Sequence, residues 1–168
     1  MKKTAVVALV LAFSMLTLPI SAVFAVSPMI EVSGTIKSSS LSSTVIREVG
    51  ENRFVFMRTA SNWTGGIFGN TVGSQTQIMH DIATLPPEHI VINVELSFVT
   101  AVVAGKRGTM TVEMNLIAFP SHPWDNHGTW RIKDAAGGLE GLHGEGEWIT
   151  YANNKSVNMY EGTVHFTK

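Results

Sequence analysis

The side chains whose grouping in this sequence could do chemistry are histidines and carboxylates. The chain contains no cysteine. His80 and Asp81 are adjacent, and such a pair can act as a general base and the group that orients it. Neighbouring residues of a strand face opposite sides, however, so Asp81 is badly placed to orient His80. We therefore expect His80 to be a histidine at the end of a strand.

Three further groups, His122, Asp125 and His127, lie close together in a segment that begins with prolines. They could supply three ligands to a metal ion, which needs three or four that converge. Their spacing matches no established zinc pattern, and a thiolate site is excluded by the absence of cysteine. The sequence therefore predicts an ordinary loop here, with no metal site and no cofactor.

A group of carboxylates, Glu140, Glu145 and Glu147, accompanies a glycine-rich run. Paired carboxylates can catalyse acid–base reactions. Glu145 and Glu147 share one side of an expected strand, opposite Trp148, so a solvated outer face suits them better. The glycine run lacks the patterns of nucleotide-binding loops, and no Gly-x-Ser-x-Gly motif of serine hydrolases occurs. The sequence thus assigns no catalytic residue.

The composition excludes other classes of protein. The 168 residues carry a formal net charge of −1, and charged residues make up 15% of the chain. Nucleic acid is not expected as a partner, because phosphate binding needs a concentrated basic surface. Disorder is not expected either, because disordered chains are rich in charge and poor in apolar residues.

The first 25 residues have the pattern of a secretory signal peptide. Lys2 and Lys3 precede an apolar run that ends before Pro19, and Val23 and Ala25 occupy the −3 and −1 positions of a cleavage site. A retained membrane anchor is the alternative, but the run of about 15 residues is shorter than the roughly 20 that span a bilayer. We expect an exported protein, periplasmic or extracellular, whose single domain, residues 26–168, has no membrane segment after cleavage.

The remaining chain alternates apolar and polar residues with period two, notably in segments 29–37, 92–98, 109–116, 130–133 and 160–166. Such alternation predicts strands with one buried and one solvated face. Glycines and prolines separate the segments; Gly105 to Gly108 predicts a tight hairpin, and the serine-rich run Ser38 to Ser43 a flexible loop. We expect an all-β fold of about eight antiparallel strands closed into a barrel, with a two-sheet sandwich as the alternative.

The alternation also assigns faces. If Ile92 points into the barrel, then Glu95 and Glu113 point outward. On segment 72–80, the side of Val72 and Ile78 would carry Ser74, Thr76 and His80 inward. The residues expected to contact a ligand in the lumen are His80, Phe98, Met114, Trp130, Trp148 and Tyr160. An eight-stranded barrel can have a filled core or hold a small ligand, and both possibilities stay open.

Several motifs carry a resemblance to a known fold. Residues 98–110 form a strand–Gly-x-x-Gly–strand pattern, residues 137–146 a run of the form Gly-x-Leu-x-Gly-Leu-x-Gly, and residues 160–166 a closing strand. Residues 90–168 thereby resemble an uncharacterised bacterial family of allene oxide cyclase-like β-barrel proteins, related to dirigent and calycin-like barrels. The resemblance implies a closed barrel with an apolar ligand in its lumen, and a homo-oligomer, since relatives with this fold are often dimers or trimers.

Two hypotheses on function follow. The first is an exported, non-enzymatic barrel that binds a small apolar molecule in its lumen or acts as an interaction module. The alternative, which depends on the resemblance alone, is a cyclase- or isomerase-type enzyme acting on an apolar substrate. Such an enzyme needs to position a flexible substrate more than it needs acids and bases.

Overall fold

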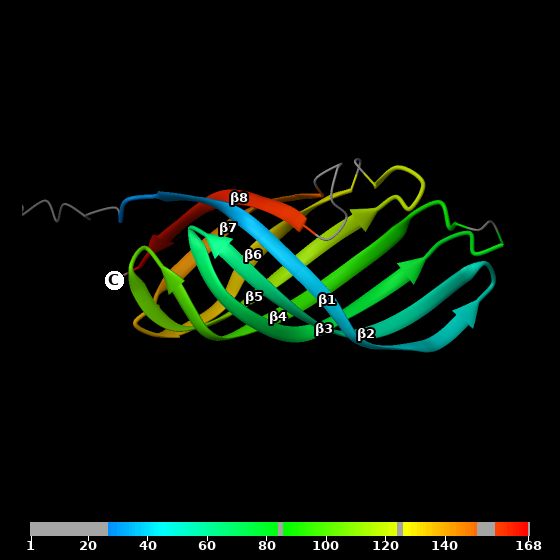
Figure 1. Cartoon of the computed structure of the whole chain (residues 1–168), viewed down its shortest axis with the longest axis horizontal. Coiled ribbons are helices and arrows are strands. Elements are labelled where there is room, and N and C mark those ends of the chain that lie inside the picture. The colour runs from blue at the N-terminus through cyan, green and yellow to red at the C-terminus, as the bar shows by residue number, and fades with distance from the viewer. Residues whose placement is uncertain (1–26, 84–85, 124–125, 151–156, 168) are drawn as a thin grey trace, which may run out of the picture.

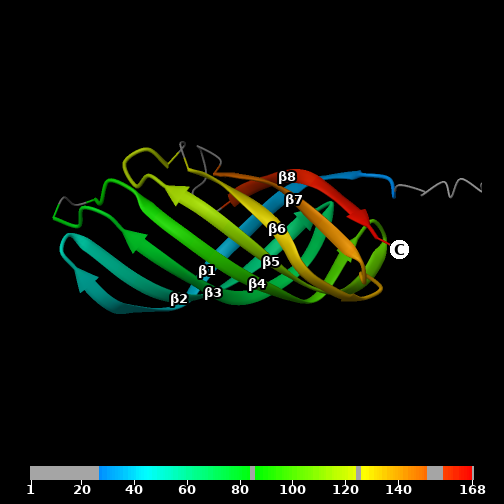
Figure 2. The same ribbon diagram turned by 180° about the vertical axis from the view of Figure 1, so that it is seen from behind.

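The computed structural model describes residues 27–83, 86–123, 126–150 and 157–167, and this part of the chain forms a closed β-barrel. Each strand pairs antiparallel with the next, and β8 returns to β1, as Figures 1 and 2 show. The strands are β1 (Ile30–Val49), β2 (Asn52–Gly65), β3 (Ile67–Met79), β4 (Ile90–Val103), β5 (Lys106–Ala118), β6 (His127–Gly137), β7 (Leu142–Thr150) and β8 (Val157–Phe166).

The predicted fold class is therefore confirmed, and the sandwich alternative is excluded. Within the described ranges, no helix is long and apolar enough to cross a membrane. The expected signal peptide, residues 1–25, lies outside the described residues.

Alternation along β4 and β5 produces the two faces of the barrel wall. Leu96 and Met114 point inward and are 2% and 3% exposed. Glu95 and Glu113 are directly opposite each other on the outer face, where the Lys133 ammonium lies 2.7 and 2.9 Å from their carboxylates. Hydrogen bonds from Lys133 and then Arg131 lower the pKa of Glu113. The inward and outward residues predicted for these two strands are thus confirmed.

The predicted hairpin between β4 and β5 is confirmed, but its turn lies earlier in the chain than predicted. Val103 pairs with Lys106, so the turn residues are Ala104 and Gly105, whose φ angles are +50° and +76°. Two positive φ angles define the type I′ geometry, whose twist matches that of the flanking strands. The turn therefore precedes the predicted position, and Arg107 already belongs to β5.

The serine-rich run Ser38 to Ser43 is not the flexible loop that the sequence predicts. It lies inside β1, paired with β2, and the hydroxyls of Ser38 and Ser61 are 2.9 Å apart across the two strands. The pairing of the backbone with β2 therefore holds this run as a strand, although its side chains are exposed. β8 accompanies β1 only from Ile30 to Lys37, so the rest of β1 pairs with β2 alone among the described residues.

The face assignment on β3 is wrong. Val72 is 42% exposed, and Ser74 and Thr76 line a shallow groove on the outer wall. The inner face of β3 carries Gly69, Thr71, Gly73 and Gln75 instead, as their pairing with the inward residues of β2 and β4 shows. A Cβ at Gly69 would lie 3.0 Å from the ring of Phe98. The backbone of β4 and the ring of Phe98 thus leave no room for a side chain at Gly69, and the apolar side chains of Phe68 and Val72 lie on the outer face.

One half of the lumen is filled by four rings, Trp63, Phe98, Trp130 and Tyr160, which we call the aromatic plug. Each is at most 2% exposed. The ring of Trp63 lies 5.4 Å from that of Phe98 and 4.9 Å from that of Tyr160, and Trp130 meets Tyr160 edge-on at 6.1 Å. These separations fall in the range at which aromatic pairs add stability beyond the area they bury.

Glycines on the inner wall make room for the aromatic plug. A Cβ at Gly146 would stand 2.7 Å from Nε1 of Trp130 and 2.0 Å from the carbonyl oxygen of Glu161. A Cβ at Gly34 would stand 2.8 Å from the hydroxyl of Tyr160. Real Cβ atoms do not approach their neighbours this closely, so the plug and these glycines depend on one another.

Substituting Gly146→Ala should destabilise the barrel by about 3 kcal/mol, the upper end of the cost of overpacking a core. The free energy of unfolding, from denaturation in urea, measures this effect. The control is Gly105→Ala in the β4–β5 turn, where a Cβ has open space and the positive φ alone should cost about 1 kcal/mol. Equal losses in the two variants would contradict the dependence of the plug on Gly146.

Candidate functional site

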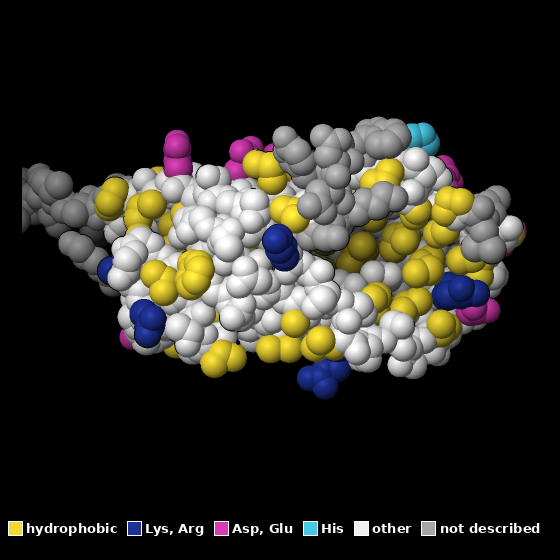
Figure 3. Space-filling model, viewed as in Figure 1, with side chains coloured by type: hydrophobic (Ala, Val, Ile, Leu, Met, Phe, Trp, Pro, Cys, Tyr) yellow, Lys and Arg dark blue, Asp and Glu magenta, His cyan; other side chains and the backbone are white. Residues whose placement is uncertain are grey.

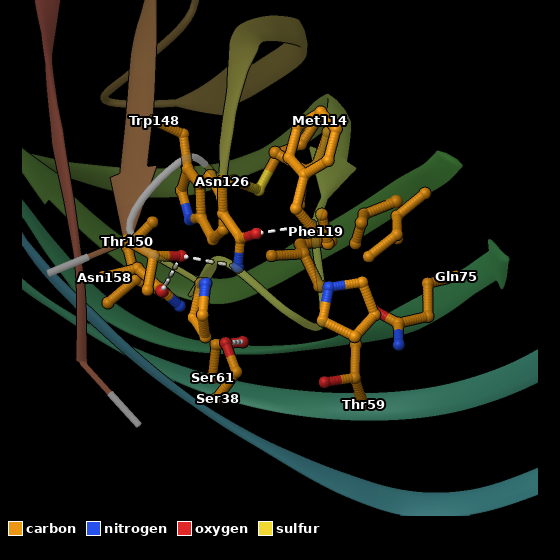
Figure 4. A pocket seen from close by; sticks show the side chains of 18 residues that line it. Ser38, Thr59, Ser61, Gln75, Met114, Phe119, Asn126, Trp148, Thr150 and Asn158 are labelled. Atoms are coloured by element: carbon orange, nitrogen blue, oxygen red, sulfur yellow. Dashed lines mark hydrogen bonds between the residues drawn. The ribbon is translucent and has the colours of Figure 1, made fainter. Parts of the chain in front are cut away.

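The other half of the lumen is hollow. It contains a cavity of about 430 Å³, within the range of about 300–1,000 Å³ typical of small-molecule sites. Figure 3 shows a hollow in the molecular surface whose floor is largely hydrophobic, and Figure 4 shows the lining side chains. These are Ile36, Ser38, Thr59, Ser61, Gln75, Ile92, Val94, Leu96, Met114, Leu116, Ala118, Phe119, Pro120, Pro123, Asn126, Trp148, Thr150 and Asn158.

One part of the cavity wall is apolar and comes mainly from β4 and β5. Val94, Leu96, Met114 and Leu116 all point inward from these two paired strands, and each is less than a tenth exposed. Trp148 extends this wall from β7 and is 7% exposed. Strand alternation thus places a continuous apolar surface against any molecule that enters.

A second part of the wall is polar and comes from β1, β2 and β3. Ser38 and Ser61 share a hydrogen bond across β1 and β2, and the Thr59 hydroxyl donates to the backbone carbonyl of Ser39 at 3.0 Å. Ser61 and Thr59 are 6% and 4% exposed. Nε2 of Gln75 donates to Sδ of Met57 at 3.1 Å. These hydroxyls and amides are neutral and already have partners, so the wall remains stable while the cavity is empty.

A third group, Asn126, Thr150 and Asn158, joins the loop before β6 to β7 and β8. The backbone N–H of Phe119 donates to Oδ1 of Asn126 at 2.6 Å, and Nδ2 of Asn126 lies 3.4 Å from the Thr150 hydroxyl. That hydroxyl lies 3.1 Å from Oδ1 of Asn158 (Figure 4). We call this arrangement the amide chain.

The lining residues in the described part of the chain include no Asp, Glu, His, Lys, Arg or Tyr. The hydrogen-bonding groups that face the cavity are hydroxyls and carboxamides, which neither take up nor release a proton near neutral pH. The arrangement can therefore orient a ligand by hydrogen bonds and desolvate it, while these side chains offer no general acid or base.

Of the residues predicted to line the lumen, Met114 and Trp148 line the cavity. Phe98, Trp130 and Tyr160 lie in the aromatic plug, in the filled half of the same lumen. A ligand-binding role for these residues stays a prediction.

His80 is not part of the cavity lining. It follows the end of β3 and stacks on His89, with ring centres 4.5 Å apart, and its backbone N–H donates to the carbonyl of His89. His89 in turn lies 6.5 Å from Phe119, which does line the cavity. His80 therefore lies at the end of a strand, as one expectation had it. It does not line the cavity, where the other expectation placed it.

The proline-bounded loop is described only in part, because Asp125 lies outside the described residues. Among the residues that the structure describes, no three histidines or carboxylates converge in a way that could hold a metal ion. Glu145 and Glu147 are exposed on the outer face of β7, where alternation places them.

The polar residues of the cavity were missed by the sequence analysis. Ser61 shares the parity of Trp63, and Asn158 shares that of Tyr160, so the alternation that located the plug could have been followed two residues further. Asn126 carries no such signal, because it stands in a loop and reaches the cavity only through its bond with Phe119.

No family model matches the chain, and no curated protein matches it either. A solved structure does resemble it: a protein with unknown function from the DUF3224 family of Shewanella oneidensis MR-1. It superimposes with a TM-score of 0.65 and 16% sequence identity, over 84% of this chain and 99% of that chain. At this identity the likeness establishes the shared all-β fold and nothing about activity.

Tyr160 makes the central hydrogen bonds of the aromatic plug. Its hydroxyl oxygen accepts the backbone N–H of Ile67 at 2.7 Å and lies 3.0 Å from the carbonyl of the same residue. Burial raises the pKa of this phenol, against the smaller, opposite effect of the bond from Ile67. The folded protein therefore keeps the phenolic proton at pH values where the unfolded chain has lost it, and stability falls as pH rises above about 10.

The substitution Tyr160→Phe should cost about 1–3 kcal/mol, because the buried N–H of Ile67 loses its acceptor. Above about pH 10, the free energy of unfolding should also fall less steeply with pH, because the variant lacks the phenol whose pKa is raised in the folded state. Urea denaturation between pH 7 and pH 11 measures both effects. Thr35→Val, which removes an exposed hydroxyl bonded to Thr64, is the control and should change neither. An unchanged alkaline slope in Tyr160→Phe would contradict the assignment.

Proposed function

We propose that the protein is an exported binding protein that holds a small, mostly apolar molecule in the hollow half of its barrel. The cavity of about 430 Å³ carries this proposal, because its lining combines a continuous apolar wall with a few fixed neutral hydrogen-bonding groups. Ligand sites in proteins have this composition. A core that served structure alone would have no reason to remain hollow at one end.

The composition of the lining favours binding over acid–base catalysis. His80 and Tyr160 were the titratable groups proposed for the lumen, and neither lines the cavity. Tyr160 is held by Ile67 inside the plug, with its hydroxyl engaged. A cyclase or isomerase that works only by positioning its substrate would differ from a carrier in one measurable way: it would release an altered molecule.

The likeness to allene oxide cyclase-like barrels is part of the same proposal. The closed eight-stranded ring is consistent with it, and proteins of that group hold apolar ligands in the lumen. The solved DUF3224 structure supports the fold and is itself of unknown function, so it adds no ligand.

Filling the cavity should abolish binding. Leu96→Trp places a large ring in the hollow from β4, whereas Val99→Trp adds the same ring on the same strand where the side chain is 75% exposed. Native mass spectrometry of protein from its own host should detect a bound molecule in the wild type and in Val99→Trp, and none in Leu96→Trp.

Circular dichroism distinguishes a filled barrel from an unfolded one, and Met114→Phe is the smaller substitution to use if Leu96→Trp does not fold. The proposal is wrong if the folded, filled variant keeps its ligand, or if no wild-type preparation carries any molecule and none can be added.

Export has its own test. If the signal is cleaved after Ala25, intact mass measurement of the protein recovered outside the cytoplasm should give a chain beginning at Val26. A mass that includes residues 1–25, found in the membrane fraction, would instead indicate a retained anchor.

A further inference from the structure

The amide chain has a fixed direction. A backbone N–H can only donate, so the bond from Phe119 places the carbonyl oxygen of the Asn126 side chain toward Phe119 and turns its NH₂ group toward Thr150. The Thr150 hydroxyl accepts this hydrogen, and in the structure it faces Oδ1 of Asn158 at 3.1 Å, to which it donates its own. The peptide N–H of Phe119 thus fixes the orientation of Asn126, and the bond between Thr150 and Asn158 gives the orientation of Asn158.

The last group of the amide chain is a donor without a partner among the described residues. Because Oδ1 of Asn158 accepts from Thr150, the NH₂ group of Asn158 points away from that bond, and it makes no hydrogen bond with any described residue. Asn158 is half-buried and lines the cavity beside Thr150, its direct partner across β7 and β8. Two N–H groups are thus presented to whatever occupies this part of the cavity, which favours an oxygen acceptor.

The rest of the lining limits the charge of the ligand. Leu96, Met114 and Leu116 form the apolar wall, and none of the described lining residues is ionisable. A carboxylate or an ammonium group would lose water here without meeting an opposite charge, which is costly. A carbonyl group is desolvated more cheaply, and the free N–H groups of Asn158 would replace the water that it loses.

We propose that the cavity binds an uncharged, mostly apolar molecule with a carbonyl group, a ketone or an ester, whose oxygen accepts a hydrogen bond from Nδ2 of Asn158. This inference rests on the proposed function, that the cavity holds a ligand, and adds its chemical class. The cavity volume equals that of about fourteen water molecules in the liquid, at about 30 Å³ each. A ligand of about a dozen non-hydrogen atoms therefore fits within it.

Three probes of nearly equal size separate the effects of a carbonyl group, of a purely apolar chain and of a negative charge on binding: 2-decanone, dec-1-ene and decanoate. Isothermal titration calorimetry of the purified protein at pH 8 should give the ketone the highest affinity. We expect dec-1-ene to bind about 3- to 10-fold more weakly, the value of one hydrogen bond, and decanoate to bind more weakly than the ketone.

Asn158→Leu is the decisive variant. It should lower the affinity for 2-decanone about 3- to 10-fold and leave that for dec-1-ene unchanged, because only the ketone uses the amide. Asn62→Leu is the matched control, since it makes the same substitution on the outer face of β2, where the Asn62 amide is exposed, bonds to Asn70 and does not line the cavity, and it should alter neither affinity. If Asn158→Leu does not fold, Asn158→Asp has nearly the same size and replaces the two donors by acceptors, and it should weaken ketone binding at pH 8.

The outcomes distinguish the two proposals. If dec-1-ene binds but the ketone gains nothing, or decanoate binds as well as the ketone, or Asn158→Leu changes ketone and alkene affinity equally, the carbonyl assignment is overturned and the binding function stands. If none of the three probes binds and no molecule accompanies the wild-type protein in native mass spectrometry, both proposals are overturned.

Discussion

The close approach of aromatic rings to glycines on the inner wall determines how this barrel uses its interior. An eight-stranded barrel has a lumen of nearly fixed width, just large enough for side chains to fill or for one small ligand. Trp63, Phe98, Trp130 and Tyr160 gather in one half because Gly34, Gly69 and Gly146 leave space that any Cβ would occupy. Beyond them the inward residues other than Trp148 are smaller, so the other half stays hollow. The cavity is a consequence of where the large rings end.

The two halves place different demands on their polar groups. In the plug, the Tyr160 hydroxyl is satisfied by backbone groups of Ile67, and Nε1 of Trp130 donates to the carbonyl of Glu161 at 3.1 Å. Leaving such buried groups unpaired is costly; in the plug, Nε1 of Trp63 is buried without a partner among the described residues. Around the cavity, the amide chain satisfies Phe119, Asn126 and Thr150 but leaves the last donor, on Asn158, open. A hydrogen-bond chain that ends at a cavity is available for recognition.

Sequence patterns predicted the fold well because strand alternation reports burial directly. It placed Leu96 and Met114 inward and Glu95 and Glu113 outward, and the structure agrees. It failed on β3, because Phe68 and Val72 lie on the outer face while Gly69, Thr71 and Gln75 form the inner wall. It also failed on the serine run of β1, which pairs with β2 as a strand while its side chains stay exposed. The site was harder still, because Asn126 reaches the cavity through a tertiary bond that no periodicity records.

The polar wall also explains how such a cavity can exist without a ligand. A closed, dry void of 430 Å³ would cost about 10 kcal/mol at about 24 cal/mol per Å³, comparable with the whole stability of a small domain, which is about 5–15 kcal/mol. The cavity avoids this cost because it opens at the molecular surface, so water can enter, and hydroxyls and amides such as those of Ser61, Thr150 and Asn158 can hydrogen-bond to that water. A ligand must then displace that water, gaining from its contact with the apolar wall while replacing the hydrogen bonds that water made to Asn158. The residues that make the empty barrel stable are therefore the ones that select what fills it.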